Sequence, residues 1–131
     1  MSAQGEDVLA WLESAIAARE QAARDAARSY GPRWVRPVDT DVVRVSEDGV
    51  VWFQALSDEI AEHVVYNSPE SALRRCAADR VLLELHGGRA HGCPARDYDG
   101  DLDDFARFYN HEVCLVVQSI AESYGWTGGD R

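Results

Sequence analysis

The first thirty residues repeat apolar positions with the period of an α-helix, and alanine fills many of the positions between them. Gly31 and Pro32 follow directly and are typical helix-ending residues. The sequence therefore predicts one long helix over residues 6–30. Charged residues at positions 19, 20, 24, 25 and 28 are expected to form pairs on its solvent face. The apolar stripe of this helix is Leu9, Leu12, Ile16, Ala23, Ala27 and Tyr30.

Residues 34–54 are rich in β-branched and aromatic side chains instead. Two short runs, at 42–45 and 50–53, flank Asp48 and Gly49, and this arrangement predicts an antiparallel β-hairpin. An isolated hairpin is only marginally stable in water, so we expect it to pack on helices. The rings expected in that core are Trp34, Trp52 and Phe53.

Two helix starts follow the hairpin. Ser57 is a typical N-cap and predicts a short helix that ends near Val65. Ser68 and Pro69 provide a stronger signal, since serine caps helices and proline favours the first helical position. We expect the second helix to run to about His86, before two glycines. Its inward-facing residues are expected to be Leu73, Ala77, Val81 and Leu85.

In the C-terminal third, the sequence predicts a glycine-rich loop over residues 87–101 and then a helix from about Asp101 to Tyr124. Residues 125–131 are expected to be disordered. Together the elements predict a single α+β domain over residues 1–131, with three to four helices packed on a small antiparallel β-hairpin. The apolar stripe expected on the last helix is Leu102, Phe105, Tyr109, Val113, Val116 and Ile120.

Composition limits the class of protein. The 131 residues are 46% hydrophobic and can bury a core without disulfides. No apolar run reaches the length of a membrane helix and no secretion signal is evident, so we expect a cytoplasmic protein that does not enter membranes. Three cysteines, an odd number, fit reduced thiols. A net charge of −10 disfavours direct nucleic-acid binding and favours a basic protein partner.

Histidine and cysteine gather in one region of the chain. His91 and Cys93 flank a glycine in the predicted loop, and His111 and Cys114 lie three residues apart in the last predicted helix, on one face of it. Thiolate and imidazole are the ligands that zinc prefers in structural sites. We therefore predict a structural zinc site formed by these four residues, with His86 as an alternate ligand.

Other interpretations of the same residues remain open. His86 can cap the carbonyl end of its helix, and Cys114 can be an ordinary buried thiol. The spacing of the cysteines contains no C-x-x-C pair, so it is not a standard zinc signature. Cys93 and His91 form a poor catalytic pair, because a flexible loop does not preorganise them. The acidic stretch 97–104 is not an EF-hand, because glycine and Phe108 occupy the wrong positions.

Arginines cluster on the helix after Pro69. Arg74, Arg75 and Arg80 form a group that can bind a phosphate or a carboxylate, although in an acidic protein internal pairing with Asp79, Glu84 or the aspartate loop is the commoner role. His63 is expected to be a packing histidine beside Ile60 and Val64.

The order of the segments resembles a family of small proteins from actinobacteria and their phages, a domain of unknown function. The resemblance covers most of the chain. It depends chiefly on residues 60–86, which include the run Leu73–Leu82 and end at His86, and also on Cys93 and the segment Cys114–Tyr124. Cysteines after the middle helix and at the start of the last segment are common in that family. A further cysteine often found between them is absent here, so the resemblance implies that His111 replaces it or that the site is lost.

The sequence therefore predicts a small cytoplasmic binding or accessory protein of an actinobacterium or its phage, with structural zinc and a protein partner. One alternative is a small metal-dependent hydrolase, in which an incomplete metal site activates water. The other is an acidic mimic of nucleic acid that occupies a basic protein.

Overall fold

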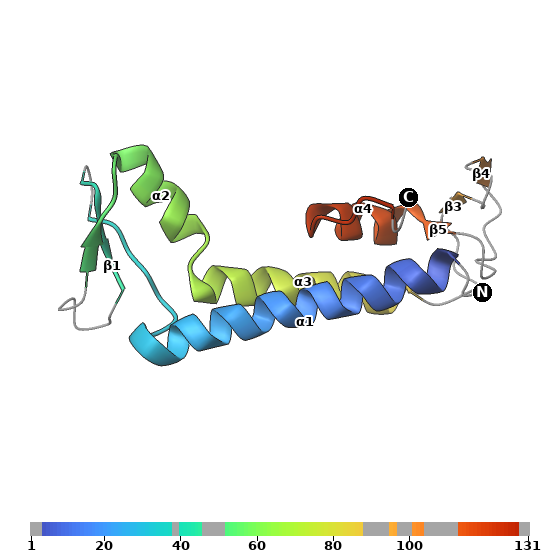
Figure 1. Cartoon of the computed structure of the whole chain (residues 1–131), viewed down its shortest axis with the longest axis horizontal. Helices are drawn as coiled ribbons and strands as arrows, with labels where there is room; N and C mark the ends of the chain where they lie inside the picture. Colours follow the sequence, from blue (N-terminus) through green and yellow to red (C-terminus); the bar gives the residue numbers. More distant parts are fainter. Residues whose placement is uncertain are drawn as a thin grey trace. The chain divides into compact units, whose positions relative to one another are not determined.

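The computed structural model describes residues 4–37, 40–45, 52–87, 95–96, 101–103 and 113–128. Contacts divide the chain into two compact units, one of Met1–Ala17 with Ala77–Arg131 and the other of Ala18–Cys76. Figure 1 shows the long helices α1 (Gln4–Tyr30) and α3 (Pro69–His86). Each contributes residues to both units. The described part of the chain is mostly helical, with short antiparallel strands, which confirms the predicted α+β class.

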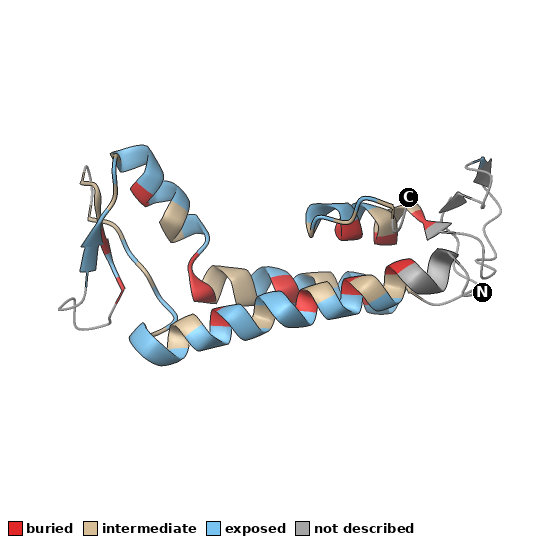
Figure 2. Ribbon diagram, viewed as in Figure 1, coloured by how far each residue is buried: buried red, intermediate tan, exposed pale blue. Residues whose placement is uncertain are grey.

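Helix α1 confirms the long N-terminal helix. Gly31, at φ 97°, follows its last residue, and its N–H donates to the carbonyl of Ala27 at 2.6 Å, as expected for a glycine that ends a helix. Burial recurs every fourth residue at Val8, Leu12 and Ile16, each at most 1% exposed (Figure 2). This repeat places one narrow apolar stripe in the core of the first unit.

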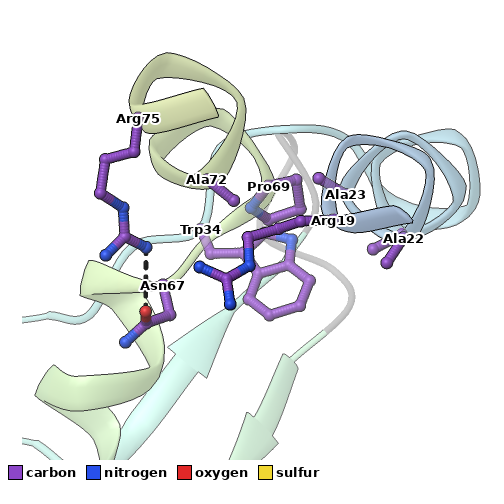
Figure 3. A pocket seen from close by; sticks show the side chains of 9 residues that line it. Arg19, Ala22, Ala23, Trp34, Asn67, Pro69, Ala72 and Arg75 are labelled. Atoms are coloured by element: carbon purple, nitrogen blue, oxygen red, sulfur yellow. Dashed lines mark hydrogen bonds between the residues drawn. The ribbon is translucent and has the colours of Figure 1, made fainter. Parts of the chain in front are cut away.

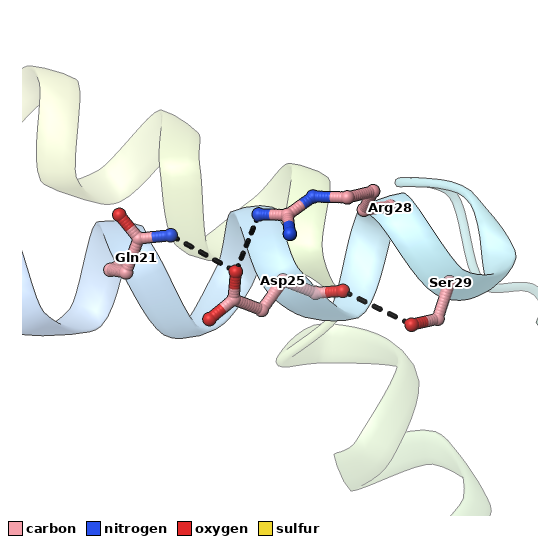
Figure 4. A network of polar contacts seen from close by, with 4 residues as sticks. All are labelled: Gln21, Asp25, Arg28 and Ser29. Atoms are coloured by element: carbon pink, nitrogen blue, oxygen red, sulfur yellow. Dashed lines mark hydrogen bonds and ion pairs between the residues drawn. The ribbon is translucent and has the colours of Figure 1, made fainter.

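The solvent face of α1 carries a short polar network. Asp25 accepts hydrogen bonds from Gln21 at 3.0 Å and from Arg28 at 2.6 Å, and the Ser29 hydroxyl donates to the Asp25 carbonyl at 3.4 Å (Figure 4). Both members of the Arg28–Asp25 ion pair are more than half exposed. The pair confirms the predicted charge pairing on this face but contributes little stability, because water screens it.

The predicted hairpin is present in the second unit. Strand β1 (Val42–Arg44) pairs antiparallel with β2 (Trp52–Gln54), with Val43 opposite Phe53 and Arg44 opposite Trp52. The predicted turn, residues 46–49, and the first two residues of the second predicted run, 50 and 51, lie outside the described residues. Val43, Val45 and Ala61 form the buried cluster of this unit.

Two of the three rings predicted in the core lie elsewhere. Trp52 is 58% exposed and Phe53 is 38% exposed, whereas Trp34 does pack against the buried cluster. Successive residues of a strand point to opposite faces, and Trp52 therefore lies on the face away from the buried Val43. A two-stranded sheet covered by a helix on one face leaves the other face in water.

Helices α2 (Asp58–Tyr66) and α3 begin where the sequence predicted. The hydroxyl of Ser57 accepts the N–H of Ile60 at 3.2 Å, which is the expected N-cap bond of α2. Ser68 precedes Pro69 and its carbonyl accepts the Ala72 N–H at 2.9 Å. No helix among the described residues is long and apolar enough to cross a membrane.

The inward face predicted for α3 is wrong. Val81 is 55% exposed and Leu85 is 64% exposed, whereas Cys76 and Leu83 are buried at 0% and 8%. Apolar side chains are spread around most of α3, so the sequence pattern does not single out one face. The buried positions lie seven residues apart, about two helical turns, on a stripe different from the one expected.

The C-terminal third departs most from the prediction. Instead of a helix from Asp101, the structure has a three-stranded antiparallel sheet in the order β4 (Leu102–Asp103), β3 (Ala95–Arg96), β5 (Val113–Cys114). Helix α4 (Leu115–Ser123) begins only after that sheet. Phe105 and Tyr109 of the expected stripe lie outside the described residues, whereas Ile120 is buried at 7% exposure.

The end of α4 is ordered by a turn. The N–H groups of Gly125 and Trp126 donate to the carbonyls of Glu122 and Ala121, both at 3.0 Å, and Gly125 has φ 100°. Residues 129–131 lie outside the described residues, and the disorder expected over 125–131 stays a prediction.

Candidate functional site

Two of the five predicted metal-ligating residues lie together in the first unit. The Nδ1 atom of His86 is 3.9 Å from the Sγ atom of Cys114. His86 is the last residue of α3, and Cys114 ends β5 and serves as the N-cap residue of α4. The contact joins positions 28 residues apart in the sequence. The described residues thus bring Cys114 into contact with His86, which the sequence named as an alternate ligand.

The elements around Cys114 explain its placement. Cys114 pairs with Ala95 of β3, so the strand ladder fixes its backbone before α4 begins. Its side chain makes no cap hydrogen bond to α4, and the residue is 5% exposed. The prediction that Cys114 lies within a helix, on one face with His111, is wrong in this respect, because the residue belongs to a strand.

His91, Cys93 and His111 lie outside the described residues, so the full predicted set stays a prediction. Among the residues that the structure does describe, no three His, Cys, Asp or Glu side chains gather around one point. The described geometry therefore supplies a pair of candidate ligands. A four-ligand site needs two more from the segments 88–94 and 104–112.

The distance within the pair fits shared coordination. Zinc bound to sulfur at about 2.3 Å and to nitrogen at about 2.05 Å with a tetrahedral angle places these two atoms about 3.6 Å apart. The observed 3.9 Å differs from this by only a few tenths of an ångström. The same distance also suits a hydrogen bond between a thiol and an imidazole. The low exposure of Cys114 disfavours a third role, nucleophilic catalysis, because a substrate needs access to the sulfur.

A second polar contact holds the same two helices together. The Tyr124 hydroxyl donates to Asp79 Oδ2 at 2.7 Å, and both residues are half-buried. Asp79 lies seven residues before His86 on α3, and Tyr124 lies ten residues after Cys114. Since the order of contacts reverses along the two segments, α3 and α4 run antiparallel here, with the His86–Cys114 contact at one end and the Asp79–Tyr124 hydrogen bond at the other.

The other candidate residues have different surroundings. His63 is exposed on α2, so the prediction that it is a packing histidine is wrong. Arg75 donates to the side-chain oxygen of Asn67 at 2.9 Å, whereas the sequence favoured pairing of its cluster with carboxylates. Asp101 is exposed, and Leu102 and Asp103 form β4. Most of the acidic stretch 97–104 lies outside the described residues.

The second unit brings together one group of residues that the sequence pattern does not predict. Arg19, Trp34, Asn67 and Arg75 line a common pocket, although they come from four separate places in the sequence. No local spacing joins Arg19 to Arg75, so only the packing of the two helices reveals the group.

Comparison with known proteins places the chain in a family. No curated protein and no solved structure matches the chain. Residues 5–125 match the model of a family of unknown function, DUF6221. The match includes both His86 and Cys114 and nearly all of the described elements. Because it covers most of the sequence, this protein belongs to the DUF6221 family of unknown function.

Proposed function

We propose that this protein is a small binding or accessory protein that recognises a basic partner protein through the surface of its second unit. The observation that carries the proposal is the exposure of large apolar side chains on the hairpin, on α2 and on the segment between them. Leu56 is 94% exposed, Tyr66 65% and Trp52 58%. Exposed apolar groups of this size, where they gather, are typical of surfaces that bind other proteins.

The negative charge on α2 indicates the kind of partner. Asp58, Glu59 and Glu62 are exposed on α2. Glu59, Glu62 and Tyr66 follow the i, i+3, i+7 spacing of one helix face. We name the residues Leu56, Glu59, Glu62 and Tyr66 the α2 surface. A partner that combines lysine or arginine with apolar side chains complements it, because opposite charges speed and orient association while apolar contacts hold the complex.

Binding of a cationic amphipathic peptide of lysine and leucine tests this surface. We expect the full chain to bind it with an affinity that falls as salt rises, since salt screens exposed charges. The double variant Glu59→Gln/Glu62→Gln should weaken binding by about fivefold or more, corresponding to roughly 1 kcal/mol. The single variant Leu56→Ala should weaken it by a similar factor. Glu84→Gln is the matched control, because Glu84 is exposed on α3 in the other unit. Equal weakening by Glu84→Gln would show that only net charge matters.

We further propose that a structural zinc ion stabilises the first unit, with Cys114 and Cys93 as thiolate ligands and two imidazoles from His86, His91 and His111. The 3.9 Å separation of His86 and Cys114 supports this. Connectivity supports it too. Cys93 precedes Ala95 by two residues and His111 precedes Val113 by two, and Ala95 and Val113 belong to the paired strands β3 and β5. Two residues span at most about 7 Å.

Zinc content of purified protein, without a histidine tag, tests this second proposal. We expect about one zinc per chain in the wild type and in Cys76→Ser, and a large loss in Cys114→Ser and Cys93→Ser. Cys76 is the matched control, because it is a buried cysteine of the other unit. Negligible zinc in every protein contradicts the site. Hydrolysis of ester or phosphodiester substrates by the zinc-loaded wild type would instead favour the hydrolase alternative.

We also propose, from the family resemblance, that the protein works in the cytoplasm of an actinobacterium, encoded either by the bacterium or by its phage. Reduced Cys76 and Cys114, neither of which is in a disulfide, are consistent with that compartment.

A further inference from the structure

A pocket of about 410 Å³ lies within the second unit, between the C-terminal part of α1 and the first two turns of α3. This volume is in the range typical of pockets that hold small molecules. Small side chains line it where the two helices face each other, which leaves the space open. These are Ala22, Ala23 and Ala26 of α1 with Pro69 and Ala72 of α3.

Two guanidinium groups enter the pocket from different helices. Arg19 extends from α1 and Arg75 from α3, and Figure 3 shows Arg75 beside Asn67 and Arg19 beside Trp34. The side-chain oxygen of Asn67 accepts a hydrogen bond from Arg75 at 2.9 Å, which orients that guanidinium. None of the described residues that line the pocket is an aspartate or a glutamate, although acidic residues outnumber basic ones by 23 to 13 in the chain. The pocket is therefore locally positive in an acidic protein.

The surrounding backbone adds to the positive potential. Pro69, which lines the pocket, is the first residue of α3, and the N-terminal end of a helix favours anions. The carboxylate in the first turn of α3 belongs to Glu70. It accepts a hydrogen bond from Arg33 at 3.2 Å, and Arg33 is outside the pocket lining. The carboxylate in the first turn of α3 is thus paired with a cation outside the pocket lining.

Trp34 provides a flat apolar wall. Its indole N–H donates to the Gly31 carbonyl at 3.3 Å, and its ring packs against the buried cluster of Val43, Val45 and Ala61. These contacts fix the ring before any ligand arrives. A fixed aromatic wall next to two guanidinium groups suits a molecule with one flat end and one anionic end.

We propose that this pocket binds a small organic anion, namely a phosphate or carboxylate group attached to a flat aromatic body. The planar N–H forks of Arg19 and Arg75 match the oxygens of either group, and charge-assisted hydrogen bonds of this kind are strong. The aromatic body lies on the alanines and the face of Trp34. The lining residues differ from those of the α2 surface and of the His86–Cys114 contact. Failure of either of those proposals therefore leaves this one unaffected.

Calorimetric titration of the full chain with phenyl phosphate, benzoate, inorganic phosphate and phenol tests the proposal. We expect saturable binding of phenyl phosphate or benzoate, with the tighter of the two identifying the head group, and at least about tenfold weaker binding of phenol, which lacks the anion. A change of tryptophan emission should accompany binding in the wild type and disappear in Trp34→Phe.

Matched variants distinguish binding in the pocket from a general effect of lost positive charge. Arg19→Gln and Arg75→Gln should each weaken binding about tenfold or more, and glutamine at position 75 retains a donor for Asn67. Arg24→Gln and Arg74→Gln are the controls, since both residues are exposed on the same two helices and neither lines the pocket. Circular dichroism confirms that each variant is folded. The proposal is overturned by absence of saturable binding below about 10 mM, by equal losses in all four variants, or by inorganic phosphate binding as tightly as phenyl phosphate.

Discussion

The hydrogen bond from Tyr124 to Asp79 is expected to stabilise the antiparallel arrangement of α3 and α4 that positions His86 and Cys114. Tyr124→Phe removes the hydroxyl alone and leaves Asp79 Oδ2 without the donor now at 2.7 Å. Hydrogen bonds to charged groups contribute about 1.5–3 kcal/mol. Both residues are half-buried, so water replaces part of the lost bond. We therefore expect a loss near the lower end of that range, about 1.5 kcal/mol.

Thermal and urea unfolding followed by circular dichroism measure this loss. For a chain of 131 residues, a destabilisation of about 1.5 kcal/mol lowers Tm by about 5 °C. Tyr66→Phe is the matched control, because Tyr66 is 65% exposed, and its change should be below about 0.5 kcal/mol. Equal stability of Tyr124→Phe and the wild type, or equal effects of the two substitutions, would refute the proposed contribution of this hydrogen bond.

Four further substitutions test the packing and the helix ends. Leu12→Ala should cost about 3 kcal/mol in urea unfolding, because Leu12 is 0% exposed, whereas Leu56→Ala should cost less than about 0.5 kcal/mol at 94% exposure. Gly87→Ala should cost about 1–3 kcal/mol, since its new Cβ would lie 2.5 Å from the Leu83 carbonyl oxygen and force a backbone shift. Ser57→Ala should cost about 1 kcal/mol in the same assay by removing the cap bond of α2. Similar midpoints for Leu12→Ala and Leu56→Ala, or wild-type midpoints for the other two variants, would contradict these assignments.

Local signals explain the parts of the fold that the sequence predicted well. Gly31 ends α1, Ser57 caps α2, and Ser68 with Pro69 begins α3, and each of these signals acts within a few residues of its own position. The hairpin was predicted from the same kind of short-range information. These elements therefore needed no knowledge of tertiary structure.

The C-terminal sheet is different because its pairing is non-local. Val113 fits a helical stripe by spacing, yet it pairs with Arg96, seventeen positions earlier in the sequence. Strand pairing of this kind overrides a weak helical pattern, and nothing in the spacing of apolar residues reveals the partner strand. The same limit applies to the pair His86 and Cys114. Residue types predicted the candidates, but only the packing of α3 against β5 and α4 shows that these two lie in contact.

X-ray absorption at the zinc edge of the full chain most directly tests whether His86 and Cys114 belong to a structural metal site. Two sulfur and two nitrogen neighbours, at about 2.3 Å and about 2.0–2.1 Å, are expected in the wild type, with one sulfur lost from any zinc that remains in Cys114→Ser. Absence of bound zinc, or a first shell of oxygen and nitrogen alone, would contradict the site and leave the contact as a hydrogen bond between a thiol and an imidazole.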